Sequence, residues 1–275
     1  MNANHLRALL GVLPLGVSAV CVAASPQYTL IDLGSTEVAG AGLVWQIQQS
    51  QLLLPNWPSS GGTECTGGTS GGYIWAQYPL SNIEVGATCE PARGQQAAKW
   101  LVNGGSATLT DLGRLPGALT DENGPFSVAY NFNNVGDIVG QSQSNSLSYS
   151  AACPACVSLH GFVYNNGAWT DLVPIAGAGY ESIANSTNDS HEVVGWTNTV
   201  SSSTGEVLNR AFVYTGGTMY NLTFYLVGGP TALLQNAYWI DCEGDIAAIG
   251  TPAAGGTTHN YLLVRQGTPR TNCPQ

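Results

Sequence analysis

Apolar and polar positions along the chain follow a short alternating pattern that recurs several times. In residues 127–140 (SVAYNFNNVGDIVG), a short apolar segment leads into an Asn/Asp/Gly turn, and a β-branched segment follows. Residues 182–195 (SIANSTNDSHEVVG) align with it without a gap, and residues 236–248 (NAYWIDCEGDIAA) fit the same frame. Residues 43–54 (LVWQIQQSQLLL) are a degraded copy. This pattern predicts β-hairpins, because Asn and Asp side chains bond the nearby backbone in turns.

A second two-strand unit follows each hairpin after a loop of variable length. In it, an apolar strand meets a glycine-rich turn, and the strand after the turn ends in Asp-Leu or Asn-Leu. The copies are residues 98–112, 160–172, 210–222 and 259–264. We expect the aromatic residues of the four copies to be equivalent, and these are Trp100, Phe162, Phe212 and Tyr261. Together the two halves make four short strands over roughly 50 to 60 residues, the size of a propeller blade.

The last unit has no Asp-Leu strand of its own. Such a strand, YTLIDLG at residues 28–34, instead stands near the start of the chain. If it pairs beside residues 261–265, every unit has four strands and the exposed sheet edges are covered. The sequence therefore predicts an all-β fold, a β-propeller-like ring of about four four-stranded blades closed by the N-terminal strand. A sandwich or a solenoid is the alternative, although no capping ends of a solenoid are visible.

The first blade is the least regular of the four. Its hairpin is the degraded copy at residues 43–54, and we interpret residues 58–96 as an insertion. Within the insertion, residues 71–77 (GGYIWAQ) resemble another aromatic strand, which leaves the blade count open between four and five.

The first 24 residues have the features of an export signal. Arg7 precedes an apolar run, and small residues come before a cut at Ser25. We therefore expect residues 1–24 to be a signal peptide and residues 25–275 a single β-repeat domain, secreted or periplasmic and monomeric. Only 9% of the residues are charged and the formal net charge is -10, which argues against binding nucleic acid or anionic membranes. No later segment has the apolar length of a membrane span.

The cysteines predict disulfides. The chain has seven, and removal of the signal with Cys21 leaves an even number in an exported protein. The expected pairs are Cys65–Cys89, Cys153–Cys156 and Cys242–Cys273. The CPAC stretch at 153–156 has the spacing of a redox motif, but it lies in a serine-rich loop rather than at the start of a helix. We interpret it as a local structural disulfide.

Several polar residues recur at one place in each unit. The residues at the end of the fourth strand are Asp32, Asp111, Asp171 and Asn221. Because Asn serves there as well as Asp, we interpret them as strand-end caps rather than as the paired carboxylates of a glycosidase. His160 and His259 share a position that Arg210 and Ala98 fill in the other units, which indicates structural histidines.

Residues 241–246 (DCEGDI) resemble an acidic calcium loop, in which Asp241, Glu243 and Asp245 would supply oxygen ligands. The bidentate Glu of such a loop is missing, so we favour a hairpin turn without a cofactor and keep calcium as the alternative. Trp57 and Trp196 border loops and are candidates for a binding face. No nucleophile-elbow, P-loop, HExxH or dinucleotide motif appears, and we assign no catalytic residue.

The repeated frame, A…N…GDIVG followed by HGFVYNNGAWTDL, resembles the bacterial HAF-repeat extracellular proteins. Their His-Ala-Phe tripeptide corresponds here to His160-Gly161-Phe162, Arg210-Ala211-Phe212, His259-Asn260-Tyr261 and Ala98-Lys99-Trp100. The resemblance implies export and a repeat scaffold, and it implies no defined activity. We therefore expect an exported, non-catalytic β-repeat scaffold or binding module for a glycan or a protein. A secreted polysaccharide-active enzyme on a propeller scaffold is the alternative.

Overall fold

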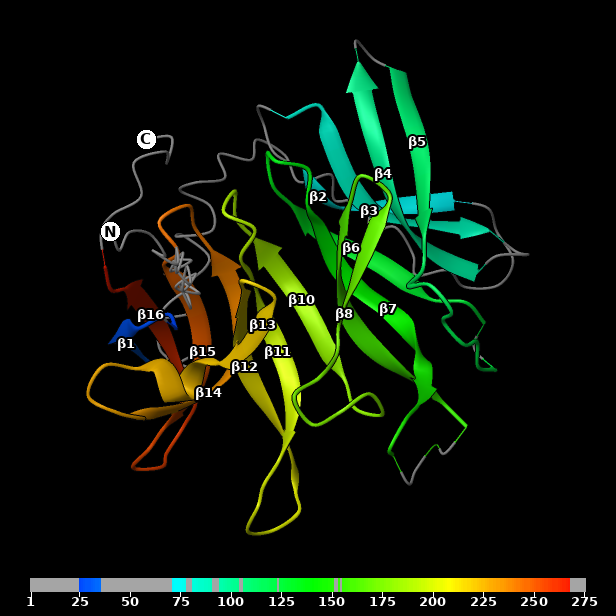
Figure 1. The fold of residues 1–275 in the computed structure, drawn as a ribbon. Helices are drawn as coiled ribbons and strands as arrows, with labels where there is room; N and C mark the ends of the chain where they lie inside the picture. The colour runs from blue at the N-terminus through cyan, green and yellow to red at the C-terminus, as the bar shows by residue number, and fades with distance from the viewer. Residues whose placement is uncertain are drawn as a thin grey trace, which may run out of the picture.

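The structure is a computed structural model that describes residues 25–35, 71–77, 81–90, 94–103, 106–122, 124–150, 153 and 155–267. These residues form sixteen strands, arranged as four antiparallel sheets of four strands each (Figure 1). A short 3-10 segment, η2 (Leu222–Tyr225), follows the third sheet. The predicted all-β fold with four-stranded units is therefore confirmed.

Each sheet takes its strands in chain order, except at the end of the fourth. The first sheet consists of β2 (Gly71–Gln77), β3 (Ile83–Glu90), β4 (Gly94–Asn103) and β5 (Ser106–Gly113). The second consists of β6 (Ser127–Phe132), β7 (Ile138–Leu147), β8 (Val157–Asn165) and β9 (Ala168–Leu172). The third consists of β10 (Ser182–Thr187), β11 (Val193–Val200), β12 (Val207–Thr215) and β13 (Thr218–Asn221). The fourth consists of β14 (Ala232–Ile240), β15 (Ile246–Pro252), β16 (His259–Arg265) and β1 (Tyr28–Ser35).

Strand β1 is the outer strand of the fourth sheet, as the missing Asp-Leu strand predicted. It runs antiparallel to β16, with Tyr28 opposite Arg265 and Asp32 opposite Tyr261. In Figure 1 the first described strand, in blue, lies beside the last, in red. Tyr28 is fully buried and Leu30 packs partly against the same core. Tyr28 is thus the main anchor of this strand.

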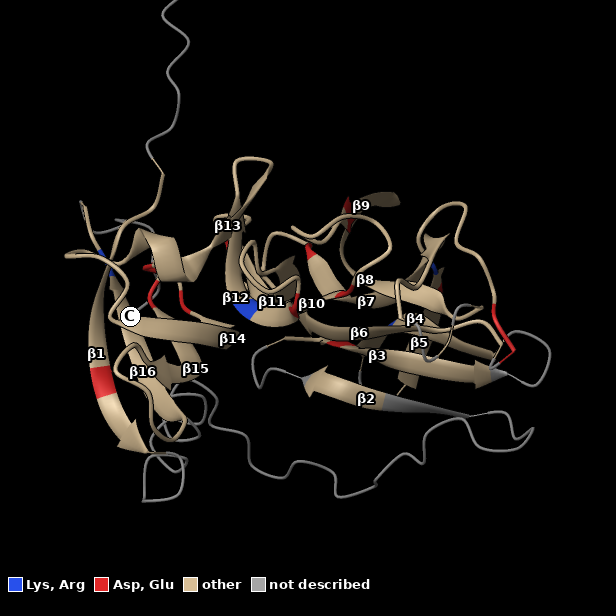
Figure 2. Cartoon of the chain, turned by 90° about the horizontal axis from the view of Figure 1, so that it is seen from below, with Lys and Arg blue, Asp and Glu red and all other residues tan. Residues whose placement is uncertain are grey.

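The core lies between successive sheets, because the first strand of each sheet packs on the middle strands of the preceding one. Strand β6 contacts β3 and β4, β10 contacts β7 and β8, and β14 contacts β11 and β12. Figure 2 shows the sheets following one another across the molecule, from β2 to β1. Apolar side chains fill each interface, and the largest fully buried ones include Phe162, Phe212 and Tyr261.

A buried serine connects the sheets at two of these interfaces. The Ser127 hydroxyl at the start of β6 donates to the carbonyl of Gly113 (2.6 Å) and accepts the Ala97 N–H (2.8 Å). In the next interface, Ser182 donates to Leu172 (2.6 Å) and accepts from Gly161 (2.9 Å). The serine shared by the two aligned hairpins therefore satisfies backbone groups of the preceding sheet, which burial would otherwise leave without a partner.

The glycine that ends each aligned Val-Gly stretch has a steric reason. Each faces a β-bulge in the preceding strand, between Ala129 and Asn131 in one sheet and between Ala184 and Ser186 in the next. A Cβ on Gly140 would lie 1.9 Å from the Val128 carbonyl oxygen, and the equivalent clash at Gly195 is 1.8 Å. No larger residue fits while the bulge is present.

The first sheet corrects the sequence analysis. Its hairpin is β2 and β3, which lie inside the segment that was interpreted as an insertion. Residues 71–77 are thus the first strand of the first sheet and not the mark of a fifth blade; residues 43–54 lie outside the described residues. Gly86, which pairs with Ala98, is the counterpart of Gly140 in the second sheet. By this alignment, Ile83 takes the position of Asp137. The hairpin was missed because it lacks the acidic residue that marks the turn in the second sheet.

The aromatic position of the first sheet is also different from the one predicted. Phe162 lies opposite Asp171, and Phe212 lies opposite Asn221. In the first sheet, the residue opposite Asp111 is Ala98 and not Trp100. The tripeptide of this unit is therefore Gln96-Ala97-Ala98. A shift of two residues keeps every side chain on the same face of the sheet, so the apolar pattern alone could not reveal the error.

Cys153 and Cys156 form the predicted disulfide, with their Cα atoms 5.3 Å apart. Cys89 and Cys242 are also disulfide-bonded. Their predicted partners, Cys65 and Cys273, lie outside the described residues, as do the expected signal peptide and Trp57. These two pairings stay predictions.

Candidate functional site

The turns between the first two strands of the sheets are linked to one another by amide side chains. Asn133 in the second sheet donates from Nδ2 to the Asn188 carbonyl in the third (2.8 Å). Asn188 donates in the same way to the Asp241 carbonyl in the fourth (2.9 Å). Each of the two also accepts, through its Oδ1, backbone N–H groups of its own turn. The Asn that recurs in the sequence therefore shapes one turn and attaches it to the next.

The acidic residue of the turn is buried and hydrogen-bonded in the second and third sheets. Asp137 accepts hydrogen bonds from Asn133 (2.7 Å), Asn165 (2.6 Å) and His191 (2.7 Å). Glu192 accepts from Asn188 (3.0 Å) and from the guanidinium of Arg265. Buried carboxylates are tolerated only with such partners.

His191 lies in the turn of the third sheet, at the position that Gly136 occupies in the aligned hairpin of the second sheet. Its φ is 60°, in the left-handed region, and the φ of its counterpart Gly136 is 94°. Its side chain is 64% exposed, although its Nδ1 contacts Asp137. Glycine and a few polar residues tolerate this backbone conformation, which explains why the two align.

The acidic stretch 241–246 is arranged as a hairpin turn. Oδ1 of Asp241 accepts the N–H groups of Gly244 (2.9 Å) and Asp245 (2.8 Å), and Asp245 accepts the N–H of Arg265 (2.8 Å). Burial, together with the charges of Asp245 and Glu243, raises the pKa of Asp241. Across the described part of the chain, no three His, Cys, Asp or Glu side chains gather in an arrangement that could hold a metal ion.

The residues at the end of the fourth strand act locally. Asp32, Asp111 and Asn221 each accept the N–H two residues further along the chain, at 2.8, 2.9 and 3.1 Å. Asp171 instead accepts from His160 Nδ1 at 2.7 Å, and Asp32 also accepts from His259 Nδ1 at 2.8 Å. In the first sheet Ala98 faces Asp111 as Phe162 faces Asp171, so the counterpart of His160 is Gln96, and no histidine stands there to pair with Asp111.

Ser158, His160 and Asp171 have the residue types of a catalytic triad but not its geometry. Ser158 Oγ lies 3.5 Å from His160 Nε2, and both atoms also lie 2.8 Å from the Ala178 carbonyl oxygen. Ser158 and His160 are completely buried. A nucleophile must reach its substrate and share its proton with the base. The trio therefore cross-links β8 to the loop that follows β9.

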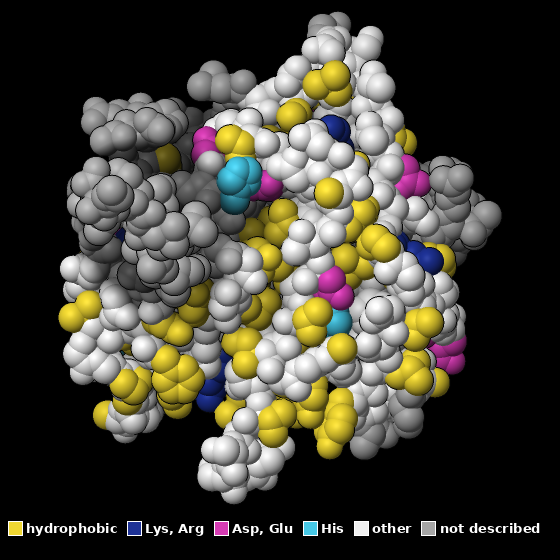
Figure 3. Space-filling model, viewed as in Figure 1, with side chains coloured by type: hydrophobic (Ala, Val, Ile, Leu, Met, Phe, Trp, Pro, Cys, Tyr) yellow, Lys and Arg dark blue, Asp and Glu magenta, His cyan; other side chains and the backbone are white. Residues whose placement is uncertain are grey.

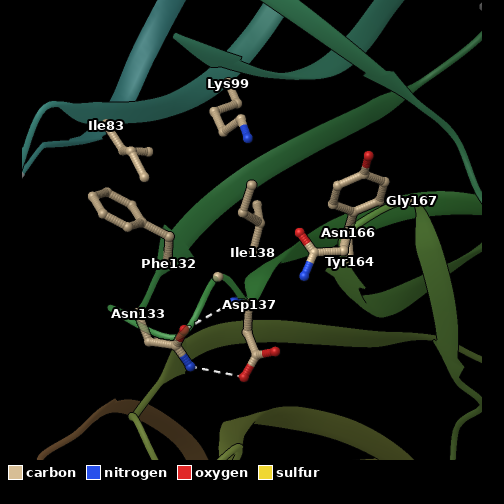
Figure 4. A pocket seen from close by; sticks show the side chains of 10 residues that line it. Ile83, Lys99, Phe132, Asn133, Asp137, Ile138, Tyr164, Asn166 and Gly167 are labelled. Carbon is tan, nitrogen blue, oxygen red and sulfur yellow. Dashed lines mark hydrogen bonds between the residues drawn. The ribbon is translucent and has the colours of Figure 1, made fainter. Parts of the chain in front are cut away.

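A pocket of about 460 Å³ opens between the first and second sheets, near the linked turns (Figure 4). One wall is apolar and consists of Ile83, Phe132 and Ile138. The polar lining residues are Lys99, Asn133, Asp137, Tyr164 and Asn166, with the glycines Gly136 and Gly167. The volume falls in the range of small-molecule sites, roughly 300 to 1,000 Å³.

Three polar groups of this pocket have no partner within the described residues. These are the ammonium of Lys99, the hydroxyl of Tyr164 and the side-chain amide of Asn166. The other basic side chains of the described chain are engaged: Arg114 with Gln143, Arg210 with the Asn209 carbonyl, and Arg265 with Glu192. Sequence reasoning missed this site, and the available signal was that Lys99 is the only lysine in the chain.

A second candidate binding surface lies on the loops after β7 and β9, at the strand ends away from the linked turns and the pocket. Tyr149, 71% exposed, stacks on Tyr180 with ring centroids 4.9 Å apart. Leu147 at the end of β7 and Ile175 on the loop after β9 are also exposed. Figure 3 shows apolar side chains gathered along the lower edge of the molecule. Trp196, a predicted binding residue, is instead half-buried in the middle of β11.

Comparisons of the chain with protein-family models, with curated proteins and with solved structures find no match. The described residues also contain no helix with the length and apolar character needed to cross a membrane.

Proposed function

We propose that the protein is an exported, non-catalytic binding module of the HAF-repeat type. One observation carries the proposal: the repeated polar residues are engaged within the scaffold, whereas three polar groups that have no partner within the described residues line one pocket between two sheets. Asn133, Asp137 and Asn188 bond across or within the turns. The ammonium, hydroxyl and amide of the pocket are left for a ligand.

The proposed scaffold is a propeller-like ring of four blades. The packing rule of the three observed interfaces supports it, because repetition of that rule would bring β2 onto the middle strands of the fourth sheet. The position of β1 supports it as well, since this strand completes the fourth sheet in the manner of a closing strand.

The alternative, a polysaccharide-active enzyme, needs two carboxylates on either side of a sugar, about 5 to 10 Å apart. The pocket lining contains one carboxylate, Asp137, and its oxygens already accept three hydrogen bonds. This favours binding over hydrolysis.

A binding screen of the purified chain against oligosaccharides tests the proposal. We expect retention of at least one ligand class without any release of new reducing ends. Hydrolysis of a bound polysaccharide that is lost in Asp137→Asn would overturn the non-catalytic assignment. An absence of binding to every oligosaccharide and to envelope proteins of the source cell would overturn the binding function itself.

A further inference from the structure

We propose that the pocket between the first and second sheets binds a sugar that carries a single carboxylate, such as a hexuronate. The inference rests on the proposed binding function and names the ligand class of that site. It is argued from the charge, the unpaired groups and the shape of the pocket.

The ammonium of Lys99 makes the pocket suited to an anionic ligand. Figure 4 shows the amine of Lys99 pointing from β4 into the pocket, whereas the carboxylate of Asp137 points away from it towards the neighbouring turn. Asp137 is held there by Asn133, Asn165 and His191. Lys99 is half-buried, and its ammonium has no partner among the described residues. Such a group favours a carboxylate, since charge-assisted hydrogen bonds are stronger than neutral ones.

The charge of the whole chain limits how anionic the ligand can be. The formal net charge is -10, so a densely charged polymer would be repelled at long range. One ammonium in the pocket matches one negative charge. A monosaccharide acid, or the end residue of a mostly neutral glycan, satisfies both conditions.

The remaining groups fit the rest of a sugar. Tyr164 offers a hydroxyl and Asn166 an amide that are both unpaired within the described residues, and both groups can donate to and accept from ring hydroxyls. On the other side, Ile83, Phe132 and Ile138 present an apolar surface to the C–H face of the ring. A simple carboxylic acid such as acetate would leave most of this lining without contacts.

Asn166 is placed for recognition rather than for turn geometry alone. It occupies a two-residue turn with Gly167, and its φ is 48°. The equivalent turn in the third sheet uses Gly216 and Gly217, with φ values of 57° and 81°. Glycine therefore suffices for the turn, and Asn166→Gly removes the side chain without disturbing the backbone.

The test is isothermal titration of the purified chain with glucuronate and galacturonate, alongside glucose, galactose and acetate. We expect one uronate to bind, with at least about tenfold lower affinity for its neutral counterpart and for acetate. Lys99→Met should weaken uronate binding at least about tenfold, Lys99→Arg should retain most of it, and Asn166→Gly should weaken it less than Lys99→Met does.

The matched control is Arg210→Gln, which changes the net charge by the same amount as Lys99→Met but lies in the third sheet. Thermal melting of each variant checks that the fold is intact. Unchanged uronate affinity in Lys99→Met, or an equal loss in Arg210→Gln, would overturn the assignment of this pocket. Binding of neutral glycans or proteins but of neither uronate would overturn the ligand class while leaving the binding function in place.

Discussion

The recurring asparagine has two structural roles at once. At Asn133 and Asn188 one side chain accepts from its own turn and donates to the next. The fourth sheet has Asp241 at this position, and an aspartate has no N–H to donate. The chain of side-chain links therefore stops at Asp241, where the half-buried carboxylate also lies among acidic neighbours.

We expect Asp241→Asn to raise the melting temperature at pH 7 by a few degrees. The amide keeps the Oδ1 acceptor for Gly244 and Asp245, and it removes a charge whose burial is unfavourable. Because the pKa of Asp241 is raised in the folded state, its carboxylate lowers stability at pH 7. This penalty disappears as the pH falls through the raised pKa.

The difference in melting temperature between parent and Asp241→Asn should therefore shrink on acidification towards pH 4. Titration of calcium into both proteins is the control for the alternative reading of this loop. If calcium stabilises the parent strongly and Asp241→Asn only weakly, residues 241–246 form a calcium site and the turn interpretation is wrong.

At the scale of the element, β1 shows how a strand far away in sequence can complete a sheet. Its ladder with β16 contributes backbone hydrogen bonds of roughly 1 kcal/mol each, and Tyr28 inserts into the core of the fourth sheet. The strand also supplies Asp32 to His259, which repeats the contact that Asp171 makes with His160 inside the second sheet.

We expect Tyr28→Ala to lower the free energy of unfolding by about 3 kcal/mol or more, because it empties a fully buried aromatic site. Deletion of residues 28–34 should cost still more and cause aggregation, since it exposes β16 as an edge. The matched control is Ile31→Ala, on the same strand but 43% exposed, with an expected effect below about 1 kcal/mol. Urea unfolding measures all three, and a deletion variant as stable as the parent would contradict the role of β1.

The sequence was informative where a turn or a strand end required a particular residue type. The Asn–Asp turns and the Asp-Leu strand of β1 were both found in this way. It was misleading in the first sheet, where Ile83 replaces the acidic turn residue and Ala98 replaces the aromatic. The pocket could not be predicted from the turn residues or from the apolar repeat, because Lys99 and Asn166 line one pocket only when two sheets pack together.

For the molecule as a whole, the arrangement of the sheets decides its size in solution. A compact domain of about 250 residues has a radius of gyration of about 18 Å. We expect small-angle X-ray scattering from the purified chain to give this value if the first and fourth sheets meet in a ring. A clearly larger radius with an extended distance distribution would mean that the four sheets form an open arc, and the ring proposal would then fail.

The pairing of β1 with β16 has a consequence for the order of the chain. Tyr28 lies opposite Arg265, and only Gln266 and Gly267 separate Arg265 from the end of the described chain. The hairpins of the second and third sheets close with two-residue turns as well, at Asn166-Gly167 and Gly216-Gly217. A gene that joins Gly267 directly to Tyr28 and starts at residue 36 would thus encode four sheets that are each contiguous. With its mean sequence separation of contacts reduced, such a circular permutant should fold faster than a parent chain that also lacks Cys273.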